Sequence, residues 1–177
     1  ITQRGGAADL TSGHDTRFSN NIRLMGPLQV SAGGAVSNTG NLIVREGVRV
    51  TAASFDNEAG AEVMAKSAAL TTSGAVRNAG KMQVKEAATI VAASVSNPGT
   101  FTAGKDLTVT SRGGFDNDGK MESNKDIVIK TEQFGNAGVL DAKHDLTVTA
   151  SGQADNRGSL KAGHDFTVQA QRIDNSG

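Results

Sequence analysis

The sequence predicts an all-β protein: a right-handed parallel β-helix whose coils each hold about 20 residues and three short strands. Three observations support this fold class. An Asn-x-Gly turn recurs at a nearly constant spacing, apolar and polar residues alternate between the turns, and no segment carries a helical apolar stripe of useful length. Such a period is typical of a solenoid rather than of a compact globular domain.

The best-preserved repeat runs from Asn156 to Val168 and reads Asn-Arg-Gly-Ser-Leu-Lys-Ala-Gly-His-Asp-Phe-Thr-Val. Successive repeated asparagines are 19, 21, 19, 20, 19, 20 and 19 residues apart. The repeat therefore predicts eight or nine coils in a rod of roughly 40 Å. The repeated asparagines are Asn38, Asn57, Asn78, Asn97, Asn117, Asn136, Asn156 and Asn175.

Each coil divides into three short alternating segments. The first follows the Asn-x-Gly turn and carries apolar residues such as Phe101 and Ala103. The second follows a turn rich in Gly, Lys, His and Asp and carries pairs such as Leu107 and Val109. The third has one apolar residue two positions before the next asparagine, as at Phe115. Each strand is expected to pair with its equivalents about 4.8 Å above and below, so that inward residues stack in columns.

The repeats are interpreted as one β-helix segment, residues 1–177, of a longer array, with an irregular first coil at residues 1–19 and regular coils at residues 20–177. Leu10-Thr-Ser-Gly-His-Asp15 resembles the later Leu160-Lys-Ala-Gly-His-Asp165, yet Phe18 follows too soon for a complete coil. At the other end we expect core side chains of the last coil, among them Phe166 and Ile173, to stay uncovered and that coil to fray.

One coil carries an extra residue in Asn57-Glu-Ala-Gly60. In a gapless register Glu62 would then occupy an inward position, where an unpaired carboxylate is costly. We therefore expect a local bulge that turns Val63 inward and leaves Glu62 facing water.

The repeated asparagines are interpreted as structural rather than ligand-binding. An Asn at the same corner of every coil can point inward and hydrogen-bond to the Asn of neighbouring coils, which would form a ladder. Its amide also satisfies turn backbone groups that would otherwise be buried without partners. The Gly two residues later is expected to supply a left-handed backbone conformation.

Composition excludes several classes of function. The 18 basic and 18 acidic residues balance, and Trp and Tyr are absent, so neither a nucleic-acid partner nor an anionic membrane surface is expected. No cysteine is present, which excludes a disulfide scaffold and a thiolate metal site. The sequence also lacks an apolar run long enough to span a membrane, so no membrane insertion is expected.

A basic row is formed by the residues Lys105, Lys125, His144 and His164, each followed by Asp, at the same place in four successive coils. One interpretation is a metal or catalytic row. The favoured interpretation is a solvated turn, in which Asp caps backbone amides and the basic neighbour offsets its charge, because no third ligand type converges on the row. No metal and no cofactor are therefore expected.

Two other surface functions have partial support in the sequence. Threonine rows such as Thr108 and Thr110 suggest an ice-binding face, but Lys130 and Gln169 interrupt them and threonine is common on exposed strands. β-Helical polysaccharide-active enzymes gather acidic residues on one face, whereas the acids here are spread around the coil without an isolated carboxylate pair. The sequence therefore predicts that the protein is not an enzyme.

The unit Asn-x-Gly-x-Leu-x-Ala-Gly-x-Asp-Leu-Thr-Val resembles the haemagglutinin repeat of the filamentous haemagglutinin family, the large two-partner-secretion adhesins of bacteria. The resemblance covers residues 20–177 and is strongest over residues 97–177. It implies a β-helical shaft that an outer-membrane partner transporter secretes and that is displayed at the cell surface. It also implies virulence-related attachment to host cells through surface receptors or glycans. The Arg-Gly-Asp motif that such adhesins can carry does not occur in this segment.

Two functions from different classes follow as expectations. The first is a shaft segment that holds binding regions away from the cell and itself binds little. The second is direct glycan or heparin binding by the basic row, with Lys105 and Lys125 meeting sulfated sugars. The inert stalk of a contact-dependent toxin is the alternative to an adhesin, because the same repeats occur there.

Overall fold

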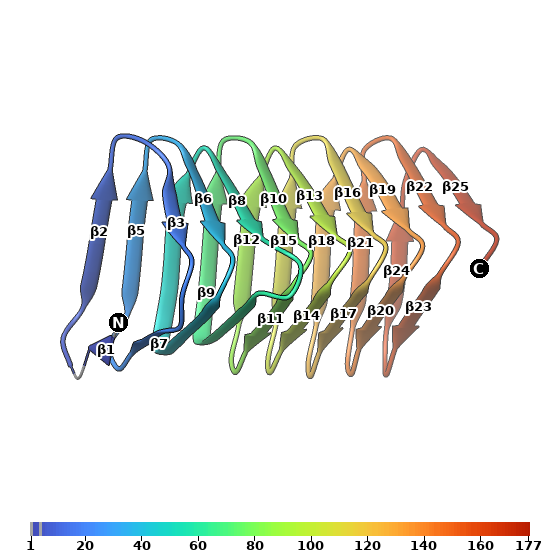
Figure 1. The fold of residues 1–177 in the computed structure, drawn as a ribbon. Coiled ribbons are helices and arrows are strands. Elements are labelled where there is room, and N and C mark those ends of the chain that lie inside the picture. The colour runs from blue at the N-terminus through green and yellow to red at the C-terminus, as the bar shows by residue number, and fades with distance from the viewer. Residues whose placement is uncertain (1, 4) are drawn as a thin grey trace.

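The computed structural model describes residues 2–3 and 5–177, which form 25 strands and no helix. The chain winds as a solenoid in which equivalent strands of successive coils lie side by side (Figure 1). The strand pairs are parallel, and equivalent residues of neighbouring coils are about one period apart, as at Asn117 and Asn136. The predicted parallel β-helix architecture, with its coils of about 20 residues, is confirmed. None of the described segments is a helix that could cross a membrane.

The first strands of the coils follow the asparagine turns. They are β1 (Thr2–Gln3), β4 (Ile22–Leu24), β11 (Lys81–Val84), β14 (Thr100–Ala103), β17 (Lys120–Ser123), β20 (Val139–Ala142) and β23 (Ser159–Ala162). The second strands are β2 (Ala8–Ser12), β5 (Leu28–Ala32), β12 (Ala88–Ala92), β15 (Leu107–Ser111), β18 (Ile127–Thr131), β21 (Leu146–Ala150) and β24 (Phe166–Gln169).

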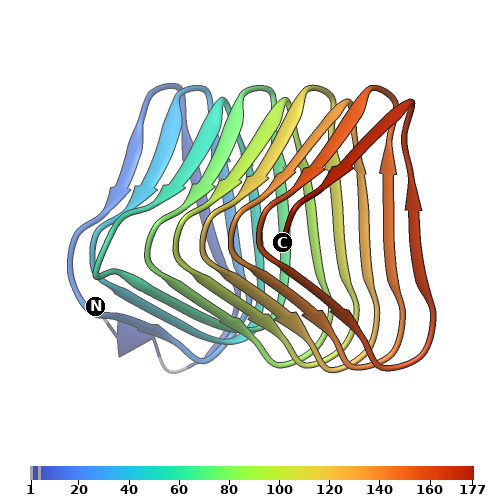
Figure 2. The ribbon, with the colours of Figure 1, turned by 90° about the vertical axis from the view of Figure 1, so that its right-hand side faces the viewer.

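In two coils the first and second strands are continuous and form the single long strands β7 (Asn41–Ala52) and β9 (Glu62–Thr72). These two strands join the first and second positions into one 16-stranded sheet. The third strands form a separate nine-stranded sheet, and the two sheets enclose the interior of the coil (Figure 2). The third strands are β3 (Thr16–Phe18), β6 (Ala35–Asn38), β8 (Ser54–Asn57), β10 (Ala75–Asn78), β13 (Ser94–Asn97), β16 (Gly114–Asn117), β19 (Gln133–Asn136), β22 (Gln153–Asn156) and β25 (Arg172–Asn175).

The core consists of columns of apolar side chains that stack from coil to coil. Phe101 pairs with Met121, and Met121 pairs with Leu140, all three being buried. On the opposite sheet the rings of Phe115 and Phe134 stack with their centroids 5.5 Å apart. Because every inward residue lies above its equivalent, even these thin coils bury their apolar side chains almost completely.

The first coil differs from the irregular coil expected at residues 1–19. β2 pairs in register with β5, from Ala8 opposite Leu28, and β3 pairs with β6, from Thr16 opposite Val36. The strand pairing therefore has no boundary at residue 19. Within the described part of this coil, Phe18 departs from the repeat, because it lies where every later coil has an asparagine.

The likeness between Leu10–Asp15 and Leu160–Asp165 does not reflect equivalent positions. Leu10 lies in a second strand, opposite Val30, whereas Leu160 lies in a first strand, opposite Leu140. The two Gly-His-Asp turns therefore occupy different corners of the solenoid. Local sequence is a poor guide here because both corners favour the same small and polar residues.

The extra residue after Asn57 is absorbed by a tight turn. Gly60 has a φ of +82°, and the Ala61 N–H donates to the Glu58 carbonyl at 3.0 Å. Beyond this turn the register is restored, because Val63 is buried opposite Leu42 while Glu62 forms an ion pair with Lys81 at 3.2 Å. The inward position of Val63 is confirmed, and the accommodation is a turn with a left-handed glycine.

Replacing Gly60 by Ala should lower the free energy of unfolding by about 1 kcal/mol, because an L residue at this φ is strained although open space surrounds its Cβ. Gly13→Ala is the matched control, since Gly13 also has open space but lies outside the left-handed region. Urea denaturation of both variants checks this, and an equal effect at both positions would contradict it.

Candidate functional site

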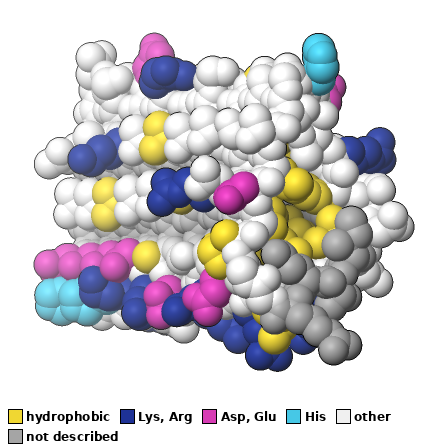
Figure 3. All heavy atoms as spheres, turned by 90° about the vertical axis from the view of Figure 1, so that its left-hand side faces the viewer, with side chains coloured by type: hydrophobic (Ala, Val, Ile, Leu, Met, Phe, Trp, Pro, Cys, Tyr) yellow, Lys and Arg dark blue, Asp and Glu magenta, His cyan; other side chains and the backbone are white. Residues whose placement is uncertain are grey.

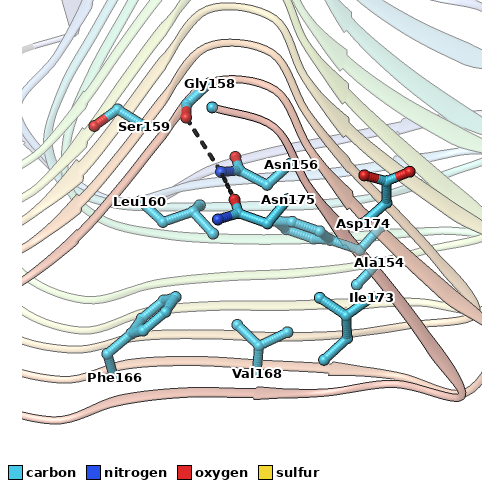
Figure 4. A pocket seen from close by; sticks show the side chains of 12 residues that line it. Ala154, Asn156, Gly158, Ser159, Leu160, Phe166, Val168, Ile173, Asp174 and Asn175 are labelled. Carbon is cyan, nitrogen blue, oxygen red and sulfur yellow. Dashed lines mark hydrogen bonds between the residues drawn. The ribbon is translucent and has the colours of Figure 1, made fainter.

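The structure brings the repeated asparagines together in one interior column. Each Nδ2 donates to the Oδ1 of the next Asn along the axis, at 2.7–2.8 Å, and the seven bonds all run in the same direction. Asn117 is fully buried, and Asn175 at the C-terminal end is exposed. The last of these bonds joins Asn156 to Asn175 (Figure 4). The column is thus a continuous hydrogen-bonded ladder.

Each asparagine amide also holds the backbone of the corner. Asn117 Nδ2 donates to the Gly119 carbonyl at 3.3 Å and to the Val139 carbonyl of the next coil at 3.2 Å. The amide therefore pairs carbonyl groups at the turn that would otherwise be buried without donors. From Asn38 to Asn156 each amide therefore donates inside the solenoid, to the next asparagine and to carbonyls of the turns.

The glycines of the Asn-x-Gly turns do not adopt the left-handed conformation expected from the sequence. Among the described residues only Gly6 and Gly60 have positive φ, and neither belongs to an Asn-x-Gly turn. Instead, a Cβ on Gly119 would lie 2.0 Å from the Gly99 carbonyl oxygen, and one on Gly138 would lie 1.9 Å from that of Gly119. Glycine is required because the turns of successive coils are in backbone contact.

The basic row lies on the surface, at the turns between the first and second strands of four successive coils. Both lysines are paired with carboxylates. Lys105 Nζ lies 3.6 Å from Glu86 Oε1, and Lys125 Nζ lies 2.9 Å from Asp106 Oδ1. The space-filling view shows acidic side chains running beside the histidines and lysines at one edge (Figure 3). The row is therefore a band of alternating charge rather than a positive surface.

The aspartates that follow the basic residues connect each turn to the next coil. Asp126 Oδ1 accepts from the Asp145 N–H at 3.1 Å, and Asp145 Oδ1 accepts from the Asp165 N–H at 3.0 Å. This is the capping role expected of a solvated turn. Sequence reasoning missed a related device, the Ser123 hydroxyl, which donates to the Lys105 carbonyl and accepts from the Lys125 N–H.

These contacts lower the pKa of two carboxyl groups. Desolvation opposes ionisation of Asp126, but the Asp145 N–H, His144 and Lys125 together outweigh it and hold its pKa below the usual range. For Asp145 the hydrogen bond from the Asp165 N–H is the main cause of its lowered pKa, with His164 adding to it. The folded structure therefore stabilises the ionised carboxylate of each group more than the protonated acid.

The two histidines of the row lie face to face. Their ring centroids are 4.9 Å apart and the ring planes differ by 10°. His144 Nδ1 lies 3.0 Å from Asp126 Oδ1, and His164 Nδ1 lies 3.1 Å from Asp145 Oδ1. Each imidazole thus contacts the carboxylate of the preceding coil.

The outward threonines do not form an unbroken row. Val128 separates Thr108 from Thr147, and Lys130 separates Thr110 from Thr149. A flat ice-binding face would need a regular array of hydroxyl and methyl groups, which the bulky apolar and charged side chains interrupt.

A hollow of about 390 Å³ opens at the C-terminal end and is lined by residues of the last two coils and by Phe134 of the coil before them (Figure 4). Leu160, Phe166, Val168 and Ile173 line it, and Phe166 and Ile173 are 52% and 55% exposed. These residues continue the core columns, since Phe166 pairs with Leu146 and Ile173 with Ala154. The hollow is therefore the interior of the solenoid seen at its end.

The family model described as the haemagglutinin repeat matches residues 23–94, 86–158 and 141–177. These matches cover most of the chain. The chain belongs to the haemagglutinin-repeat family. It is also similar to filamentous hemagglutinin of Bordetella pertussis (strain Tohama I / ATCC BAA-589 / NCTC 13251), with 92% identity over 106 residues. That alignment covers 60% of this chain and 3% of the curated relative. No solved structure matches the chain.

Replacing Asn117 by Ala should destabilise the haemagglutinin-repeat solenoid by about 2–4 kcal/mol, because it removes the acceptor of the Asn97 amide and the donors to the buried Asn136 Oδ1 and to the Val139 carbonyl. Thr147→Ala, on an outward strand position, should cost no more than about 0.5 kcal/mol. Chemical denaturation of the two variants checks this, and similar losses would show that the ladder does not stabilise the coil.

Because the pKa of Asp126 is lowered in the folded protein, its contribution to the free energy of unfolding should depend on pH. A carboxyl whose folded pKa is depressed stabilises the fold above its unfolded pKa of about 3.9, and this stabilisation is lost as pH falls through the folded pKa. The stability difference between the wild type and Asp126→Asn should therefore be largest near pH 7 and should shrink below about pH 4. Denaturation across this range measures it, and a constant difference would contradict the assignment.

Proposed function

We propose that this segment is part of the stiff shaft of a surface-displayed bacterial adhesin and that it acts as a spacer which itself binds little. The observation that carries the proposal is the uninterrupted coil-to-coil pairing of strands and asparagines from β6 to β25. An array of this kind extends along one axis by repetition. Membership of the haemagglutinin-repeat family and the name of the Bordetella relative favour an adhesin over the stalk of a toxin.

The proposal includes secretion to the bacterial surface through a dedicated outer-membrane transporter. The absence of cysteine from the chain suits passage through an oxidising compartment, because no disulfide can form before the coils are complete. Parallel coils can also fold one after another as the chain emerges, since each pairs only with its neighbours. Host-cell contact is assigned to the whole adhesin, of which this chain corresponds to a small part.

Glycan binding by the basic row is the competing function. Sulfated sugars are recognised through accessible cations, and Lys105 and Lys125 are more than half exposed. Both are nevertheless paired with carboxylates, which would repel an anionic sugar. The spacer function is therefore the better supported of the two. Catalysis is not proposed, because Asp126 and Asp145 are occupied in holding turns and basic neighbours.

Heparin chromatography of the 177-residue chain at low and physiological ionic strength tests the proposal. A spacer should elute without retention at physiological salt, where the screening length is about 8 Å. Weak retention at low salt should be the same for Lys105→Gln/Lys125→Gln and for the control Lys66→Gln/Lys81→Gln, whose lysines are paired with Glu46 and Glu62 at comparable exposure.

Retention at physiological salt that the Lys105/Lys125 variant loses and the Lys66/Lys81 variant keeps would overturn the spacer function and favour glycan binding. The same variants applied to epithelial cells give a second readout. If the wild-type segment binds to the cells and only the Lys105/Lys125 variant loses this binding, the result would also overturn the spacer function.

A further inference from the structure

The two-histidine end of the basic row contains a cluster of three groups that transition metals prefer. His144, Asp145 and His164 each offer one ligand atom, and these atoms lie within 4.8 Å of one another. They come from the turns before β21 and β24, which are adjacent coils. The solenoid therefore brings together residues that are 20 positions apart in the sequence.

The distances around Asp145 are the central observation. Its Oδ1 lies 3.1 Å from His144 Nδ1 and also 3.1 Å from His164 Nδ1. Because the three ligand atoms lie within 4.8 Å of one another, an ion placed among them is near all three, and the usual metal–nitrogen distance is about 2.1 Å. Small rotations of the two half-exposed rings would bring the nitrogens to that distance. Asp126 Oδ1, 3.0 Å from His144 Nδ1, accepts from the Asp145 N–H and so holds the Asp145 turn beside the cluster.

The charge along the row also changes at this point. In the two preceding coils the corresponding residues are Lys105 and Lys125, and Lys125 compensates Asp106 and Asp126. Among the described residues, the ion pairs of Asp145 and Asp165 involve only histidine. Histidine is not a permanent cation, but its unprotonated nitrogen is a metal ligand. In the last two coils, histidines that can bind a metal cation thus stand where the preceding coils have permanently charged lysines.

We propose that His144 Nδ1, His164 Nδ1 and the Asp145 carboxylate bind a divalent transition metal such as Zn²⁺. Imidazole and carboxylate are the ligands that such ions accept at exposed sites. The ion takes the place of the proton that each Nδ1 otherwise shares with a carboxylate. Because the ligands belong to two coils, the bound ion joins the β20–β21 turn to the β23–β24 turn and stabilises the second of these coils.

Calorimetric titration of Zn²⁺ into the 177-residue chain, in a buffer that does not chelate the ion, tests this. One ion should bind per chain, and the melting temperature should rise with Zn²⁺ concentration. His144→Gln and His164→Gln should each weaken binding at least about tenfold and abolish the thermal shift. Two separate variants keep the test valid if one of them folds poorly, which circular dichroism would show.

His14→Gln is the matched control. Like His164, His14 stands in a Gly-His-Asp turn, but at a different corner of the coil, where Gly34 of the next coil lies near Asp15. This variant should bind Zn²⁺ like the wild type. No heat of binding up to millimolar Zn²⁺, or equal binding by wild type and both His144→Gln and His164→Gln, would overturn the proposal, as would loss of binding in His14→Gln.

Discussion

The hydrogen bonds that run along the axis are the constraint on which the rest of this solenoid depends. A coil of three short strands has few residues with which to pair its own polar groups, so it must pair them with the coils above and below. The asparagine ladder extends this requirement into the interior, since the buried amide of Asn117 is satisfied only when Asn97 and Asn136 lie one coil away. Inside a low-dielectric core an unpaired amide is costly, so the ladder holds successive coils to one register.

The same constraint explains which sequence variation the repeat tolerates. The spacing between asparagines varies from 19 to 21 residues, yet the amide-to-amide distance from Asn57 to Asn78 remains 2.8 Å. The extra residue after Asn57 is absorbed in the surface turn at Gly60, and another between Val44 and Gly47 is absorbed by a register shift within β7. Positions where backbone meets backbone are less tolerant. Gly119 has no room for a Cβ against the Gly99 carbonyl, so the turn composition reflects packing between coils.

The columns of the core could be predicted from the sequence because alternation and period are local properties. Phe101, Leu107 and Phe115 each follow a turn at a fixed offset, and all three are buried. The regular pairing of the first coil was missed because Phe18 replaces the asparagine used to find the register. The sequence favours a solvated turn over a metal site at His144, Asp145 and His164, because no third ligand type converges on the row. Asp145 Oδ1 is equidistant from both imidazoles only in the stacked coils, and sequence spacing does not give that distance.

The common direction of the ladder gives the rod a polarity. Side-chain amides that all donate toward the C-terminal end add their dipoles, much as peptide groups do along a helix. The ladder begins at the buried Asn38, beside Phe18, and its last amide belongs to the exposed Asn175. The strands of neighbouring coils are parallel and so share this direction. The two ends of the rod are therefore different, and two copies can add strand to strand in the same direction only head to tail.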